Sequence, residues 1–138
     1  MKPVLETKEL TKIFAAEGKS DFTAVDHVNF QLYPGEILGI VGESGSGKST
    51  LVRAVSRLTD VTEGSIFLDG QDITRIKGKA LRQCYKKLQM VFQTPVTSFD
   101  PRRTLGDGIG ESLRNSGTSK AEAKKEVLRL LSQCGLSE

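Results

Sequence analysis

A glycine-rich segment, GESGSGKST at residues 42–50, constrains this chain more than any other feature of its sequence. It fits the pattern G-x-x-x-x-G-K-[ST], with Gly42, Gly47, Lys48 and Ser49 at the fixed positions. Glycines allow successive backbone N–H groups to point inward and form a concave nest for an anion. A helix that begins near Gly47 adds its free N–H groups and the positive end of its dipole. The segment therefore predicts a phosphate-binding loop.

The sequence on both sides of the loop fits a strand–loop–helix arrangement. Residues 37–41 form a continuous apolar run, ILGIV, which is typical of a buried parallel strand. Apolar residues recur after the loop at helical spacing, at Leu51, Val52, Val55 and Leu58. This context favours a phosphate site over a chance glycine-rich turn. It also disfavours a dinucleotide fingerprint, because Thr50 stands where that motif needs glycine or alanine.

The residue types of the loop suggest a role for each position. Lys48 can reach the β- and γ-phosphates of a nucleotide, and the hydroxyl of Ser49 can ligate Mg²⁺. Glu43 is expected to be solvated and not to act as a base. The predicted nucleotide-binding residues of the loop are Gly42, Glu43, Ser44, Gly45, Ser46, Gly47, Lys48, Ser49 and Thr50.

Composition excludes several classes of function. With 20 basic and 17 acidic residues the net charge is +3, which is too small to indicate nucleic-acid binding. Cys84 and Cys134 lack disulfide or metal-site spacing and indicate reduced thiols of a cytosolic protein. No apolar run approaches the roughly 20 residues of a membrane span, and the N-terminus lacks the apolar core of a signal peptide. We expect a cytoplasmic location, with any membrane role peripheral.

Periodicity and turn residues divide the rest of the chain into elements. Strands are predicted at residues 4–14, 28–32, 64–68 and 88–92, with turns at 33–36 and at Asp69-Gly70. Helices are predicted at residues 105–113 and from the capping box at 119–122 to a cap at Gly135. The fold class is α/β, with an antiparallel β-layer beside a partial parallel core sheet that is incomplete at the C-terminus. Residues 1–97 are expected to form the nucleotide-binding core, and 98–138 the start of a helical subdomain.

Several motifs together resemble the ATP-binding subunits of ABC transporters. They are VGESGSGKSTL, the hairpin EGSIFLDGQDIT, the segment TKIF, and LQMVFQ followed by TPVTSFDPRR. The combination is most similar to the peptide and nickel importer branch, although Thr94 and Val96 depart from its usual residues. The resemblance implies a P-loop fold of ABC type, ATP and Mg²⁺ as cofactors, and ATP hydrolysis coupled to import of a small solute.

The resemblance also implies roles for residues outside the loop. Phe14 would stack on adenine, and Gln93 would ligate Mg²⁺ or orient the attacking water as a catalytic residue. The segment 93–103 would contact transmembrane permease subunits, and a second ATPase subunit would complete the parent protein.

Some motifs of the family do not occur in this sequence. There is no LSGGQ and no apolar strand ending in Asp-Glu after Gln93, and His27 precedes the loop, so it is not the switch histidine. We therefore expect the N-terminal part of a larger ATPase, which binds nucleotide without hydrolysing it alone. Two alternatives stay open: a non-catalytic fragment that docks on membrane subunits, and a soluble non-transport ABC ATPase.

Overall fold

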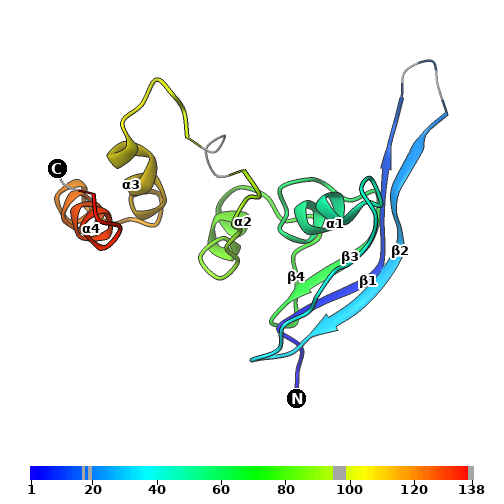
Figure 1. Ribbon diagram of the computed structural model, residues 1–138. Coiled ribbons are helices and arrows are strands. Elements are labelled where there is room, and N and C mark those ends of the chain that lie inside the picture. Colours follow the sequence, from blue (N-terminus) through cyan, green and yellow to red (C-terminus); the bar gives the residue numbers. More distant parts are fainter. Residues whose placement is uncertain (17, 19, 95–98, 137–138) are drawn as a thin grey trace. The chain divides into compact units, whose positions relative to one another are not determined.

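The computed structural model describes residues 1–16, 18, 20–94 and 99–136 (Figure 1). The chain divides into two compact units, Met1–Gln89 and Met90–Glu138, each with its own internal packing. The predicted boundary after residue 97 falls inside the second unit. Within the described residues, no helix is both long and apolar enough to cross a membrane.

An antiparallel sheet forms the base of the first unit. Its strands are β1 (Leu5–Phe14), β2 (Phe22–Leu32), β3 (Glu63–Leu68) and β4 (Gln71–Asp72), in the spatial order β2-β1-β3-β4. All three strand pairs are antiparallel, which confirms the predicted antiparallel β-layer. The β3–β4 hairpin turns at Asp69 and Gly70, which both have positive φ as a type I′ turn requires.

The β1–β2 pair is irregular, and hydroxyl groups satisfy its displaced backbone groups. Glu9 and His27 both have positive φ, at 49° and 46°. The hydroxyl of Thr7 donates to the Val28 carbonyl oxygen and accepts from the Phe30 N–H, each at 3.1 Å. Buried threonines therefore replace ladder hydrogen bonds where the register shifts.

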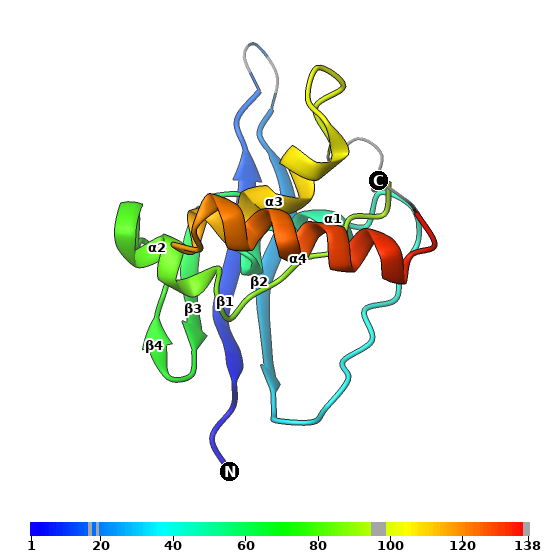
Figure 2. The same ribbon diagram turned by 90° about the vertical axis from the view of Figure 1, so that its left-hand side faces the viewer.

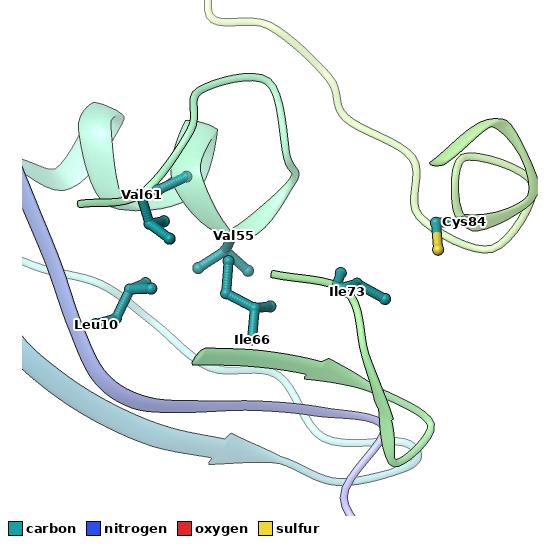
Figure 3. Packing of buried hydrophobic residues seen from close by; sticks show 7 residues of the cluster. Leu10, Val55, Val61, Ile66, Ile73 and Cys84 are labelled. Carbon is teal, nitrogen blue, oxygen red and sulfur yellow. The ribbon is translucent and has the colours of Figure 1, made fainter. Parts of the chain in front are cut away.

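Helix α1 (Lys48–Val55) covers one face of this sheet. Leu10 and Ile66 of the sheet and Val55 of α1 meet in the core, as Figure 3 shows. Val61, Ile73, Ala54 and the buried Cys84 of α2 (Gly78–Cys84) complete the buried cluster. Of the apolar residues predicted at helical spacing after the phosphate loop, Leu51 and Val55 pack on the sheet, whereas Val52 and Leu58 are exposed.

The C-terminal end of α1 is fixed by a buried arginine. Arg57 has φ of 59°, and its Nε donates to the Ile73 carbonyl oxygen at 2.9 Å. The hydroxyl of Tyr85 donates to the Arg57 carbonyl oxygen, also at 2.9 Å. These bonds join the end of α1 to the segments on either side of α2.

Two predicted parallel strands are wrong for this structure. Residues 37–41 follow an irregular path, drawn in cyan in Figure 2, and Ile37 and Val41 are each 96% exposed. Residues 88–92 are also irregular, and Val91 is 91% exposed. A strand needs a hydrogen-bonded neighbour, and among the described residues no strand pairs with either segment. Apolar patterning alone therefore predicted burial that these segments do not have.

The second unit contains two capped helices, α3 (Leu105–Asn115) and α4 (Lys120–Gln133), which confirm the helices predicted here. The Ser119–Glu122 capping box is present at the start of α4. At its end, Gly135 has φ of 74° and the Leu136 N–H donates to the Leu131 carbonyl oxygen at 3.0 Å, as in a Schellman motif.

Glycines in α3 allow close packing against α4 (Figure 2). A Cβ added to Gly106 would lie 3.7 Å from a methyl of the buried Val127, and one added to Gly110 would lie 3.3 Å from its other methyl. In α4, Ala123 and Val127 are buried, whereas Cys134, which directly follows the helix, is exposed.

Candidate functional site

The glycine-rich loop leads directly into α1. Gly45 and Gly47 have positive φ, at 82° and 91°, and Gly47 is the residue that precedes the helix. The Leu51 N–H donates to the Gly47 carbonyl oxygen at 2.8 Å as the first hydrogen bond of the helix. The N–H groups of the first turn have no intrahelical acceptor, so they can bind an anion. The predicted loop–helix arrangement is confirmed.

Lys48 folds back across this loop. Its Nζ donates to the carbonyl oxygens of Gly42 at 2.7 Å and Glu43 at 2.5 Å, and to the hydroxyl of Ser46 at 3.3 Å. The ammonium group is therefore held by the loop backbone, next to the start of α1. The positive charge of Lys48 in this position adds to the positive end of the dipole of α1, and both attract an anion.

Close contacts surround the glycines at both ends of the loop: the contact of Gly42 is with a serine side chain that can rotate, and the contact of Gly47 is with backbone that cannot. A Cβ on Gly42 would lie 2.6 Å from the Ser46 hydroxyl oxygen. A Cβ on Gly47 would lie 2.1 Å from the carbonyl oxygen of Ala24 on β2. The loop is thus pressed against the backbone of the β1–β2 pair.

The remaining polar residues of the loop are open to solvent. Glu43, Ser44 and Ser49 are exposed, and Thr50 is half-buried. The described residues hold no cluster of three or more His, Cys, Asp or Glu side chains that could bind a metal ion. A hydroxyl such as that of Ser49 suits Mg²⁺, which keeps several waters and is commonly shared with phosphate oxygens.

An exposed aromatic pair lies near the point where the loop contacts the β1–β2 hairpin. Phe14 ends β1 and is 43% exposed, and Phe22, directly opposite on β2, is 59% exposed. Ala24 lies two residues from Phe22, so the aromatic pair and the phosphate loop share one end of the hairpin. The structure therefore places Phe14 and the loop in the same unit.

Gln93 is exposed and belongs to the second unit, so the structure does not join it to the phosphate loop of the first. Of the predicted segment 93–103, residues 95–98 lie outside the described residues, and Val96 is among them. Asp100 and Arg102 form an exposed ion pair at 3.1 Å within this segment.

A hollow that sequence reasoning missed lies in the second unit. Its volume is about 520 Å³, and the apolar side chains in its wall come from two stretches. The wall residues are Met90, Val91, Phe92, Phe99, Asp100, Arg103, Thr104, Gly108, Ile109, Glu111 and Ser112. The apolar residues on both sides of residues 93–98 are the sequence signal for it.

Comparison with known proteins agrees with the phosphate loop. Residues 25–138 match the family described as ABC transporter. The chain is 37% identical to the oligopeptide transport ATP-binding protein OppF of Streptococcus mutans, over 99% of this chain and 45% of that protein. It is 46% identical to the glutathione import ATP-binding protein GsiA of Pectobacterium atrosepticum, over 82% of this chain and 18% of that protein.

A solved structure with similar architecture is the dimeric ATP-binding cassette MJ0796 in a post-hydrolysis state, bound to ADP and Pi. The TM-score is 0.82 at 28% identity, covering 97% of this chain and 58% of that one. Nearly all of this chain matches OppF and the MJ0796 cassette, but it spans only about half the length of either protein.

Proposed function

Because the chain belongs to the ABC transporter family, we propose that it binds the phosphates of ATP, together with Mg²⁺, at residues 42–50. The observation that carries this proposal is the position of Lys48 Nζ, 2.7 Å from the Gly42 carbonyl oxygen and beside the first turn of α1. The ammonium group and the N–H groups of the loop provide the positive charge and donors that a polyphosphate requires.

The other predicted residues extend this site. The hydroxyl of Ser49 supplies a ligand to Mg²⁺, and the exposed ring of Phe14 supplies a surface on which adenine stacks. Such stacking contributes about 1–3 kcal/mol for bases on aromatic side chains. Gln93 supplies a second Mg²⁺ ligand or orients the attacking water in the parent protein.

For the parent protein we propose ATP hydrolysis that drives import of a small solute. The oligopeptide and glutathione relatives favour a peptide-like solute, and nickel stays a prediction from the resemblance of the sequence. The ATPase would lie on the cytoplasmic face of the membrane, paired with a second ATPase subunit. Permease subunits would bind the segment 93–103, and the apolar hollow beside it supports a docking role.

We propose that this chain alone binds ATP without hydrolysing it. The sequence lacks the signature LSGGQ and the Asp-Glu strand end that the family uses in hydrolysis. Phosphoryl transfer depends on positioning and charge neutralisation, and the residues present supply only the binding part of that machinery.

Calorimetric titration with ATP, with and without Mg²⁺, tests the phosphate site. Lys48→Ala removes charge-assisted hydrogen bonds worth about 1.5–3 kcal/mol, so the affinity should fall by about 10- to 150-fold. Lys125→Ala, at an exposed position of α4 in the second unit, is the matched control and should bind like the wild type. Equal affinities of the wild type and Lys48→Ala would refute the assignment.

A further inference from the structure

Lys12 lies against the ring of Phe14, the ring on which we propose that adenine stacks. Its Nζ is 4.9 Å from the centroid of the Phe14 ring. A cation within about 6 Å of a ring centroid is attracted by the negative face of the ring. One face of Phe14 is therefore covered by an ammonium group of the same strand.

The register of β1 shows on which side of the sheet this contact lies. From Leu10 to Lys12, and from Lys12 to Ile13, β2 advances one residue more than β1, so the extra residues belong to β2. β1 stays regular from Leu10 onward, and its alternate residues point to one face. Leu10 is fully buried under α1. Lys12 and Phe14 therefore share the face of the sheet that carries α1.

The extra residue of β2 between Lys12 and Ile13 is Ala24. Its carbonyl oxygen is the atom that a side chain on Gly47 would strike. Gly47 of the phosphate loop thus lies against the same irregular stretch of the hairpin that carries Lys12 and Phe14. Lys12 lies next to the ring of Phe14 at this end of the hairpin.

We propose that Lys12 is a positioning residue for the nucleobase: it covers one face of Phe14 and leaves the opposite face for a purine. The proposal rests on the proposed ATP site. The ammonium group holds the exposed ring in one orientation before the base arrives, which reduces the entropy lost on binding. Phe22 stands opposite Phe14 across the strand pair.

The same strand offers a matched control. Lys8 Nζ lies 4.9 Å from the centroid of the Phe67 ring on β3, so it makes the same kind of contact as Lys12. Lys8→Met and Lys12→Met remove the same charge and the same kind of contact, and only the second is next to Phe14.

The experiment titrates the 138-residue chain with Mg-ATP and with inorganic tripolyphosphate, which has no base. Lys12→Met should weaken ATP binding by about two- to five-fold, the range of an exposed cation–π contact. Tripolyphosphate should bind unchanged, which also shows that the phosphate loop is intact. Lys12→Arg should retain the wild-type affinity for ATP, and Lys8→Met should bind both ligands like the wild type.

A double-variant cycle tests whether Lys12 acts through the ring. In a Phe14→Leu background, Lys12→Met should cause no further loss of ATP affinity. The proposal is overturned if Lys12→Met binds ATP like the wild type, if it weakens tripolyphosphate equally, or if the two substitutions act additively. A wild-type chain that binds neither ligand would overturn the proposed function as well, so the two failures are distinguishable.

Discussion

Replacing Gly47 with alanine tests how tightly the phosphate loop is pressed against the sheet. The new methyl group would lie 2.1 Å from the Ala24 carbonyl oxygen, at a φ of +91°. An L-residue in the left-handed region costs about 1–2 kcal/mol. Overpacking against atoms that cannot move freely adds about 1–3 kcal/mol. We expect Gly47→Ala to lower the free energy of unfolding by about 2–5 kcal/mol in total.

Gly45→Ala separates the two contributions. Gly45 has φ of +82°, yet a Cβ there would meet nothing within 4 Å. This variant should lose only the backbone term, about 1–2 kcal/mol. Urea titrations followed by far-UV circular dichroism measure both variants, with an unchanged slope as the sign that the unfolded states are comparable. The reasoning is refuted if Gly47→Ala is no less stable than Gly45→Ala.

Three further predictions concern the caps, the acid response and hydrolysis. Ser119→Ala removes the capping box of α4 and should cost about 0.5–2 kcal/mol in urea unfolding, whereas Ser119→Thr keeps a hydroxyl and should retain most of the stability. Hydrogen bonds from the Thr74 hydroxyl and N–H lower the pKa of Asp72 below its usual 3.8. The ionised Asp72 therefore contributes its full stabilisation of the folded state above pH 3.8, and this contribution is lost as the pH falls through the lower pKa of the folded state. In Asp72→Asn, the melting temperature should therefore fall less steeply with decreasing pH in this acid range than in the wild type. Phosphate release from ATP should stay at background, and turnover that survives repurification and disappears in Lys48→Ala would contradict this.

The parts of this protein that were predictable from sequence are those set by nearby residues. The loop before α1 depends on glycines and on the lysine beside them, and the start of α4 depends on Ser119 and Glu122. The β3–β4 turn follows from Asp69 and Gly70 alone. Each of these is a contact between residues a few positions apart, so the local pattern contains the information.

The parts that escaped prediction depend on distant partners. Residues 37–41 have the composition of a buried strand. A strand forms only beside another strand, however, and the apolar pattern does not show which segment would pair with these residues. The irregular register between β1 and β2 was also missed, because threonine hydroxyls satisfy it from across the pair. The contact of Lys12 with Phe14 depends on the regular alternation of β1 beyond Leu10, which the sequence pattern alone does not specify.

The hydrogen bonds of Arg57 at the end of α1 depend on the arginine side chain but hardly on the side chains of the residues that accept them. Its guanidinium donates to the main-chain carbonyl oxygens of Ile73, Thr59 and Ile76, and among the described residues Asp60 contributes the one side-chain acceptor. Carbonyl oxygens are present whatever residue supplies them. These hydrogen bonds therefore survive a change of the accepting side chain as long as the backbone path is kept, although Ile73 is itself held in place as a fully buried core residue. Arg57 has no such freedom, because lysine lacks the planar fork that reaches several acceptors at once.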